Sequence, residues 1–317
     1  MIATSTQVEE ARGLLRKFLQ PTRLLRSESL ERPSRAAQVY LKVESDLPTS
    51  SFKPRGAFYA LLTTAKQRTL TGVVAASTGN HGAAVAYAAR FAKLPATIFL
   101  PENPNPVKRT RIVGLGGWVI ERGDVSLSTQ AAAAFAREHG HYFLDDATDP
   151  FVPVGTATIA CEILDEIPRP DVIFVPMGDT ALIRGVATEA KRRHPAVRVI
   201  GVQAEQAPAY ARSWEQGRVI VTDTCDTIAD GLATRRPHEA NVNAIRELVD
   251  EVRLVSERDL LNAIRVLLLD EHIVAEAAGA AATAAFLHDA SGYAGQTVVL
   301  LMTGANIPPK VLRRAVL

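Results

Sequence analysis

The chain has 317 residues, of which 47% are apolar and 22% are charged, and its formal net charge is +2. This length suits two compact domains better than one small core. A charge so close to balance gives no reason to expect nucleic acid or an anionic membrane surface as a partner.

The cysteines and the N-terminal segment favour a cytoplasmic protein. Cys161 and Cys225 are the only cysteines, and their wide spacing indicates two reduced thiols rather than a disulfide framework or a zinc site. Residues 1–19 mix charged and apolar side chains and lack the continuous apolar run of a signal peptide. No stretch reaches the ~18 uninterrupted apolar residues of a membrane span.

Short apolar runs rich in β-branched residues alternate with segments of helical periodicity along the chain. Strands are expected at 72–76, 96–100, 172–176, 197–202 and 297–302, and helices at 82–93, 126–139 and 155–166. This alternation predicts an α/β fold of doubly wound parallel sheets with helices on both faces. Ligands of such sheets bind beyond the carboxyl ends of the strands, so the turns there are the expected functional segments. The polar stretch 234–241 predicts a surface loop.

A lysine among hydroxyl residues marks the first candidate segment, residues 49–57. Lys53 directly follows Phe52 in the sequence Thr-Ser-Ser-Phe-Lys-Pro-Arg-Gly-Ala. Burial favours the neutral form of a lysine amine, and a neutral amine attacks an aldehyde to form a Schiff base. A solvated lysine beside a turn made by Pro54 and Gly56 explains the same segment about equally well.

The segment Ser-Thr-Gly-Asn-His at 77–81 follows a predicted strand and opens a predicted helix. Free N–H groups at a helix N-terminus attract anions, and the hydroxyls of Ser77 and Thr78 add donors, so this segment is predicted to bind a small carboxylate. Asn80 is suited to hydrogen-bond an oxygen of a cofactor ring. Helix capping by Ser77 or Thr78 is the simpler alternative, and His81 is equally consistent with packing against the sheet.

A loop of small residues after the strand at 172–176 is suited to a phosphate, because it again leads into a helix N-terminus. It consists of Gly178, Asp179, Thr180, Ala181 and Leu182. The carboxylate of Asp179 would repel a phosphate, so its side chain is expected to point away and to cap the helix. Arg184 either offsets this charge or is a solvated helix residue.

Thr303 follows the last predicted strand, in the sequence Thr-Gly-Ala-Asn. A threonine at this place offers a neutral hydrogen bond to a ring nitrogen. An ordinary turn at the end of a strand is the alternative.

Together, and in this order, these segments resemble the fold-type-II pyridoxal-phosphate enzymes, above all the threonine/serine dehydratases and serine racemases. The resemblance runs from about Leu41 to about Asn306. The motifs that carry it are Ser-Phe-Lys-x-Arg-Gly-Ala at 51–57, Ser-x-Gly-Asn-His at 77–81, and the segments 227–233 and 276–280.

The resemblance implies a tryptophan synthase β-like architecture. Residues 1–69 and 146–317 would form a large cofactor-binding domain, and residues 70–145 a small mobile domain. The cofactor, pyridoxal 5'-phosphate, would lie in the cleft between them. Relatives of this kind commonly pair through the larger domain, so a homodimer is expected.

The resemblance also implies roles for individual residues. Lys53 would hold the cofactor as a Schiff base and then act as the general base, with Phe52 packed beside it. Asn80 would bond the ring hydroxyl oxygen, and Thr303 would face the pyridine nitrogen. The substrate carboxylate would be held by Ser77, Thr78, Gly79 and His81. The phosphate would be bound by Gly178, Asp179, Thr180, Ala181 and Leu182.

The implied reaction is β-elimination of a hydroxy-amino acid such as L-threonine or L-serine to a 2-oxo acid and ammonia. Thr78 stands where racemases carry a catalytic serine, so an amino-acid racemase is an alternative. The family phosphate loop is a run of glycines that this chain lacks, so a cofactor-binding relative without turnover is another. Gln203 and Ala209 replace the acidic residues of metal-dependent relatives, so no divalent metal is predicted there.

Overall fold

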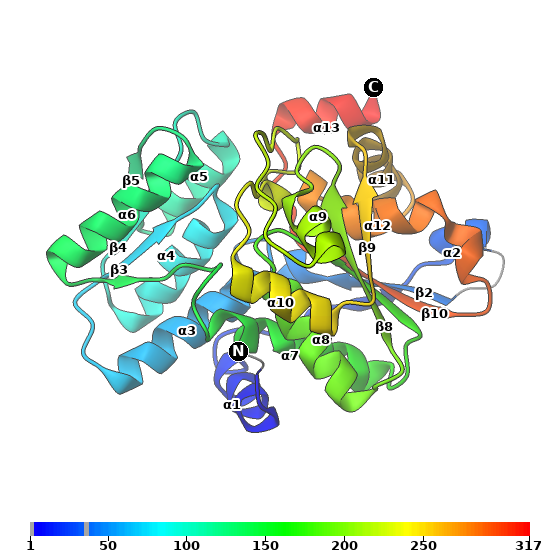
Figure 1. Ribbon diagram of the computed structural model, residues 1–317, viewed down its shortest axis with the longest axis horizontal. Helices are drawn as coiled ribbons and strands as arrows, with labels where there is room; N and C mark the ends of the chain where they lie inside the picture. Colours follow the sequence, from blue (N-terminus) through cyan, green and yellow to red (C-terminus); the bar gives the residue numbers. More distant parts are fainter. Residues whose placement is uncertain (1–2, 35–37) are drawn as a thin grey trace.

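Two β-sheets with helices packed on their faces form the structure, a computed structural model that describes residues 3–34 and 38–317. Figure 1 shows the four-stranded sheet and its helices on one side and the six-stranded sheet with the C-terminal helix on the other. Neighbouring strands are parallel in both sheets, apart from one edge pair. The predicted α/β fold with two parallel sheets is therefore confirmed.

The six-stranded sheet has the strand order β1-β2-β10-β7-β8-β9. Only the short edge strand β1 runs antiparallel, to β2, within the described residues. The strands are β1 (Leu24–Arg26), β2 (Gln38–Val43), β7 (Val172–Pro176), β8 (Arg198–Ala204), β9 (Glu251–Val255) and β10 (Thr297–Met302).

Both faces of the six-stranded sheet are covered, because the central strands bury alternate side chains in opposite directions. In β10, Val298 and Leu300 belong to the core formed with α11 and α12, whereas Val299 and Leu301 belong to the core formed with α7 and α8. These helices are α7 (Val152–Glu166), α8 (Ala181–Arg193), α11 (Glu257–Leu269) and α12 (Ala277–His288). The remaining helices around this sheet are α2 (Glu28–Ser34), α9 (Ala209–Gln216), α10 (Glu239–Leu248) and α13 (Pro309–Val316), and α1 (Ser5–Leu15) packs on α7.

The four-stranded sheet is built in the same way, with the strand order β5-β4-β3-β6. In β4, Ile98 and Leu100 pack in the core that contains α3 and α4, and Phe99 packs on the opposite face with α6. Its strands are β3 (Val73–Ala76), β4 (Ala96–Leu100), β5 (Trp118–Glu121) and β6 (Tyr142–Phe143). Its helices are α3 (Pro54–Gln67), α4 (Asn80–Ala92), α5 (Pro106–Gly114) and α6 (Val125–His139).

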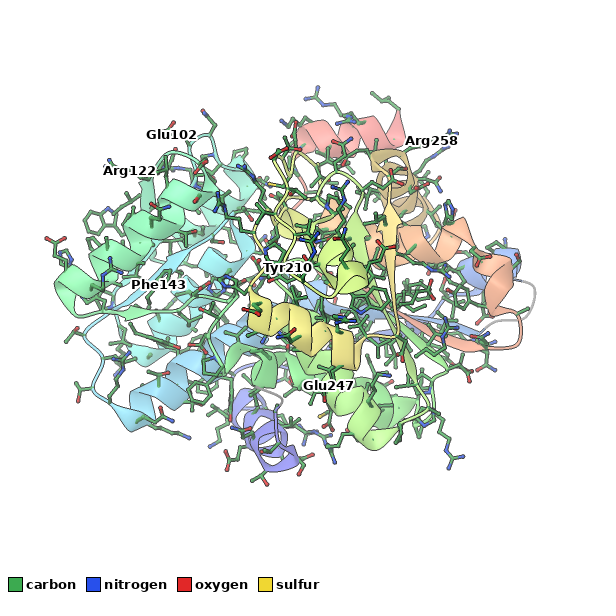
Figure 2. The ribbon with its side chains drawn as sticks, in the orientation of Figure 1. Glu102, Arg122, Phe143, Tyr210, Glu247 and Arg258 are labelled. Carbon is green, nitrogen blue, oxygen red and sulfur yellow. The ribbon has the colours of Figure 1, made fainter. Side chains whose placement is uncertain are left out.

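The expectation of a surface loop at 234–241 is wrong in part. The helix α10 begins at Glu239, and the side chains of Thr234 and Asn241 are buried. The cause is Tyr210, labelled in Figure 2, whose hydroxyl accepts hydrogen bonds from His238 N at 3.2 Å and Asn241 Nδ2 at 3.1 Å. A buried hydrogen-bonding partner thus orders a stretch that composition alone assigns to solvent.

The helices α3 and α7 touch where each carries a glycine. A Cβ atom added at Gly155 would lie 2.2 Å from the carbonyl oxygen of Arg55, and one added at Gly56 would lie 2.6 Å from Val152 Cγ1. Because the carbonyl belongs to a helix backbone, it moves only with the whole of α3. We expect Gly155→Ala to lower the free energy of unfolding by about 1–3 kcal/mol, the usual cost of overpacking, as measured by urea denaturation.

A matched control is Gly13→Ala in α1, where the glycine is exposed and no atom lies within 4 Å of the added Cβ. Alanine is favoured over glycine in a helix interior by about 1 kcal/mol, so this variant should be slightly stabilised. Equal stability changes in the two variants would contradict the close approach of the helices.

Candidate active site

A cavity lies between the two sheets, beyond the carboxyl ends of β3, β7 and β10. Ser77 and Thr78 enter it from the end of β3, Gly178 from the end of β7 and Thr303 from the end of β10. This is the place where parallel sheets bind ligands. The residues predicted from the sequence that line it are Phe52, Lys53, Ser77, Thr78, Asn80, His81, Gly178, Asp179, Thr180, Ala181, Leu182 and Thr303.

Lys53 reaches into this cavity from the residue just before α3. Its ammonium group forms an ion pair with the carboxylate of Asp146 and lies 5.1 Å from the centre of the Phe52 ring. Only 21% of the Lys53 side chain is exposed, so the alternative of a solvated lysine beside a turn is wrong. Phe52 and Asp146 instead fix the position of the amine.

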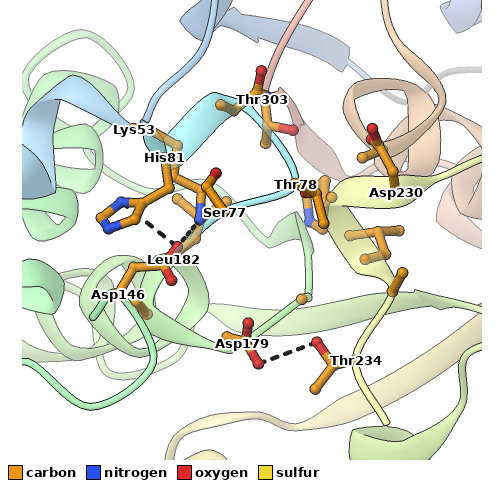
Figure 3. A pocket seen from close by; sticks show the side chains of 18 of the residues that line it. Lys53, Ser77, Thr78, His81, Asp146, Asp179, Leu182, Asp230, Thr234 and Thr303 are labelled. Carbon is orange, nitrogen blue, oxygen red and sulfur yellow. Dashed lines mark hydrogen bonds and ion pairs between the residues drawn. The ribbon is translucent and has the colours of Figure 1, made fainter. Parts of the chain in front are cut away.

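Asp146 is shared between Lys53 and His81, as Figure 3 shows. His81 Nδ1 lies 3.8 Å from Asp146 Oδ2, and the other ring nitrogen is 2.9 Å from the carbonyl oxygen of Leu144. Burial would raise the pKa of Asp146, but His81 and Lys53 outweigh it and hold the pKa at about 2. Asp146 is therefore an ionised carboxylate at neutral pH.

The loop that opens α4 is ordered by its own serine. Ser77 Oγ accepts hydrogen bonds from the N–H groups of Gly79 at 2.8 Å and Gly82 at 3.0 Å. Gly79 has a φ of +145°, and a Cβ there would lie 2.4 Å from the side chain of Lys108. Gly79 is therefore required by its backbone and by this contact. It does not belong to the cavity lining, and its N–H already has a partner in Ser77.

Asn80 is held at the cavity wall by residues from the other sheet. Its Nδ2 donates to Glu276 Oε1, and its Oδ1 accepts from Asn306 Nδ2 at 2.9 Å. These bonds fix which end of the amide is the donor. One of the two hydrogens on Nδ2 is used by Glu276, and the second remains for another acceptor.

Lys108 in α5 joins the same network. Its ammonium lies 2.9 Å from Glu276 Oε2 and 2.6 Å from Asp230 Oδ1, and its side chain is 2% exposed. Burial alone would lower the pKa of Lys108, but Glu276 and Asp230 together raise it above its ordinary value. A charged lysine beside the four-stranded sheet is thus paired with carboxylates beside the six-stranded sheet.

The loop before α8 begins the helix with a residue in a left-handed conformation. Thr180 has a φ of +68°, and its Oγ1 accepts a hydrogen bond from Arg184 Nε at 3.1 Å. Arg184 Nη2 donates to the carbonyl oxygen of Ala147 at 3.1 Å. Arg184 is 7% exposed, and burial lowers its pKa. The alternative of Arg184 as a solvated helix residue is therefore wrong.

The side chain of Asp179 differs from the expectation. It does not cap α8, where Thr180 takes the cap position and its side chain accepts no hydrogen bond from the helix backbone. Asp179 lines the cavity, and its Oδ1 accepts a hydrogen bond from Thr234 Oγ1 at 3.1 Å (Figure 3). Burial, with a contribution from Asp146, raises the pKa of Asp179 to about 6. The physical reason is Thr234, a partner from a distant loop that draws the carboxyl to the cavity wall.

Several lining residues were not predicted from the sequence. Asp146 and Thr234 line the cavity without belonging to any of the segments singled out as functional, and Asp230, within the segment 227–233, had been given no role. For Asp146 a signal existed, because it follows a strand end as Ser77 and Thr303 do. The strand concerned, β6, has only 2 residues and is too short to be recognised from periodicity.

The described residues contain no group of three or more His, Cys, Asp or Glu side chains able to hold a metal ion. Gln203 is buried, and its Oε1 accepts a hydrogen bond from Ala211 N at 2.9 Å, while Ala209 is the first residue of α9. Cys161 and Cys225 are both free thiols. No helix in ranges 3–34 and 38–317 is long and apolar enough to cross a membrane.

Known solved structures share this fold over nearly the whole chain. A maize serine racemase superposes with a TM-score of 0.92 at 26% identity, covering 99% of this chain and 97% of that one. The processed form of threonine deaminase isoform 2 from Solanum lycopersicum superposes with a TM-score of 0.90 at 26% identity, covering 99% of this chain and 93% of that one.

Sequence comparison agrees with this structural similarity. The chain is 34% identical to an L-threonine ammonia-lyase of Thermotoga maritima, over 99% of this chain and 78% of that protein. It is 36% identical to an L-threonine ammonia-lyase of Geobacter sulfurreducens, over 97% of this chain and 76% of that protein. A family model described as pyridoxal-phosphate dependent enzyme matches residues 15–304. The cavity that gathers Lys53 and the loops at 77–81 and 178–182 thus lies in a member of the family of pyridoxal-phosphate dependent enzymes.

Proposed function

We propose that this enzyme removes water and then the amino group from a β-hydroxy-amino acid, with L-threonine or L-serine as substrate, and releases a 2-oxo acid and ammonia. The observation that carries the proposal is the meeting of Lys53 with the loops at 77–81 and 178–182 in one cavity. L-threonine ammonia-lyases with 34% and 36% identity to this chain support the choice of reaction.

The cavity fits pyridoxal 5'-phosphate group by group. The amine of Lys53 suits the aldehyde, and the start of α8 suits the phosphate. Asn80 retains a hydrogen for the ring hydroxyl oxygen, and Thr303 offers a neutral hydroxyl to the ring nitrogen. The phosphate loop is also shaped by close packing, because a Cβ at Gly178 would lie 2.4 Å from the carbonyl oxygen of Gly231. We therefore assign Lys53 as the residue that carries the cofactor through a Schiff base.

When bound, the cofactor supplies an electron sink for negative charge that develops at the substrate α-carbon. Lys53 would hold the cofactor and would take the α-proton of the substrate as general base. Asp146 accepts a hydrogen bond from the Lys53 amino group and keeps it in the cavity. Ser77, Thr78 and the start of α4 orient the substrate carboxylate. Movement of residues 70–145 toward the six-stranded sheet excludes water from the reacting carbon.

A racemase is the second candidate, supported by Thr78. Its side chain lines the cavity and lies on the side of Asp230 in Figure 3, away from Lys53. A hydroxyl there can exchange a proton with the α-carbon on the face opposite Lys53. Chiral analysis of L-serine after incubation tests this reading, and a complete absence of D-serine would remove it.

The test of elimination is an assay on the protein loaded with pyridoxal 5'-phosphate. We expect an absorption band of the bound cofactor, and release of 2-oxo acid and ammonia in equal amounts on addition of L-threonine or L-serine. β-Phenylserine extends the test to a bulkier substrate. A cofactor band without 2-oxo acid from any of these amino acids would contradict elimination and favour a cofactor-binding relative without turnover.

We further propose that the enzyme is a cytoplasmic homodimer with a large domain of residues 1–69 and 146–317 and a small mobile domain of residues 70–145. Free thiols at Cys161 and Cys225 support a reducing compartment. The separate sheet formed by β3 to β6 supports a small domain within 70–145. Sedimentation equilibrium at micromolar concentration tests the dimer, and a species of 34.2 kDa alone would contradict it.

A further inference from the structure

An acidic residue stands in the loop to which we assign the cofactor phosphate. Asp179 lies between Gly178 and Thr180, directly before α8, and its side chain lines the cavity. A carboxylate at this position repels a phosphate, whereas the free N–H groups at the helix start attract one. The loop therefore carries opposing charges at a single anion site.

The groups around Asp179 have no excess of positive charge before a phosphate arrives. The cations Lys53 and Arg184 face the carboxylates of Asp145, Asp146 and Asp179. Lys53 is paired with Asp146, and Arg184 has hydrogen bonds to the neutral oxygens of Thr180 and Ala147. A phosphate monoester adds close to two negative charges at neutral pH. Its arrival would leave the site strongly negative unless a carboxylate gains a proton.

The hydrogen bond of Asp179 leaves one oxygen for that proton. Thr234 Oγ1 donates to Oδ1 of Asp179 at 3.1 Å, so Oδ1 acts as an acceptor. In Figure 3 the second oxygen points away from Thr234 into the cavity. A proton on this oxygen would convert Asp179 from an acceptor into an O–H donor aimed at the ligand.

We propose that Asp179 holds the cofactor phosphate as a neutral carboxylic acid that donates its O–H to a phosphate oxygen, so that binding takes up one proton from solvent. The proposal rests on the proposed function, because that function places the phosphate in the loop at 178–182. The buried guanidinium of Arg184, bonded to Thr180 in the same loop, supplies the fixed positive charge behind the site.

The environment of Asp179 favours its neutral form before any ligand arrives. Burial and the neighbouring Asp146 raise its pKa to about 6, against the opposing effect of Lys53. An adjacent phosphate raises the pKa further, because a like charge disfavours ionisation. Above pH 6 the free protein must take up a proton to bind, so phosphate affinity falls as the pH rises. The other titratable groups around Asp179 or in the same cavity include Asp145, Asp146, Lys53, Arg184, Tyr210, Cys225, His81, Asp230 and Glu276.

The experiment measures the dissociation constant of pyridoxine 5'-phosphate, which has no aldehyde and so does not react with Lys53. Wild type and Asp179→Asn are titrated at pH 6 and pH 8, since the asparagine amide donates at both values. The ratio of the wild-type constant to the variant constant should rise from about 2 at pH 6 to about 100 at pH 8, because each pH unit above the pKa costs a factor of ten. Comparing the two proteins cancels the ionisation of the phosphate itself.

Controls separate Asp179 from its surroundings. Asp145→Asn changes another carboxyl in the cavity lining, one that accepts a hydrogen bond from Thr148, and its affinity should still fall as the pH rises, because Asp179 is retained. Asp179→Gly restores a glycine and should also lose the pH dependence, which guards against a folding defect in the asparagine variant. Pyridoxine without phosphate should show the same ratio at both pH values.

The outcomes are distinct for the two proposals. Tight binding with equal pH dependence in wild type and Asp179→Asn would overturn the role of Asp179 and leave the proposed function standing. Failure of wild type and Asp179→Asn to bind pyridoxine 5'-phosphate even at pH 6 would overturn both proposals. A ratio that rises with pH for the phosphate ester and not for pyridoxine supports the proton uptake.

Discussion

Lys53→Ala should lower the release of 2-oxo acid by at least about 10³-fold, the scale of losing a positioned general base together with a covalent attachment. The amine of Lys53 lies in the cavity beside Phe52 and is paired with Asp146, so no neighbouring residue replaces it there. Reduction with borohydride followed by mass spectrometry measures the attachment directly. Wild type should gain the mass of the cofactor, and the alanine variant should not.

Lys53→Arg is the matched control for this change. It keeps a cation against Asp146, so the protein should remain as stable as wild type, but a guanidinium does not form the covalent attachment. In Lys53→Ala the carboxylate of Asp146 keeps the effect of His81 on its pKa but loses that of Lys53. A variant without the amine that still gains the cofactor mass would show that another residue carries the cofactor.

The second large effect is expected at Arg55, a residue of the same motif that points away from the cavity into a buried ion-pair network. Arg55 Nε lies 2.7 Å from Glu44 Oε2, and Arg55 Nη1 lies 2.6 Å from Glu162 Oε1. Lys42 Nζ lies 2.6 Å from Glu162 Oε2. Burial would lower the pKa of Arg55, but Glu44 and Glu162 raise it above its ordinary value. This network of two cations and two carboxylates has no net charge only while Arg55 is present.

Arg55→Met should lower the free energy of unfolding by about 3–5 kcal/mol, because it leaves buried carboxylates with too few cations. Arg23→Met is the control, since Arg23 pairs with Asp46 at the surface and 58% of its side chain is exposed. A surface pair contributes about 0–1 kcal/mol. Denaturation by urea measures both variants, and similar losses in the two would contradict the importance of the buried network.

The network also predicts how stability depends on pH. Burial opposes ionisation of Glu162, but Arg55 and Lys42 hold its pKa at about 2. A depressed folded-state pKa contributes stability above the unfolded-state value of roughly 4.3, and that contribution is lost as the pH falls toward 2. Arg55→Met removes part of the depression, so the variant should lose less of its remaining stability between pH 5 and pH 3 than wild type does.

Central strands could be predicted from the sequence because they are buried on both faces. The strands β4, β7 and β10 have the expected bounds, and each is a nearly continuous apolar run. Edge strands could not be predicted in this way, because such a strand is partly exposed to solvent and carries charged side chains. Glu251–Val255 alternates charged with apolar residues, and Trp118–Glu121 is only partly buried. Their pairing with neighbours, not their composition, makes them strands.

The residues of the candidate site likewise include some that could be predicted from the sequence and some that could not. Ser77, Thr180 and Thr303 were found because each lies in a local motif at the end of a strand. The sequence did not predict the direction of the Asp179 side chain or the burial of Arg184. These depend on hydrogen bonds to Thr234 and Ala147, which lie far away in the sequence. Residue type and spacing thus locate a site, whereas its protonation states depend on contacts that only the folded chain makes.

The pairing of Lys108 with Asp230 and Glu276 affects how substrates enter the cavity and how products leave it. If the sheet of β3 to β6 moves away from the other sheet, this ammonium must leave both carboxylates at once. A bare ammonium in an apolar gap is very costly, so the separation proceeds only as solvent molecules replace the lost partners. Entry of solvent between the two sheets, rather than a change in backbone conformation, would then limit how often reactants bind and products dissociate.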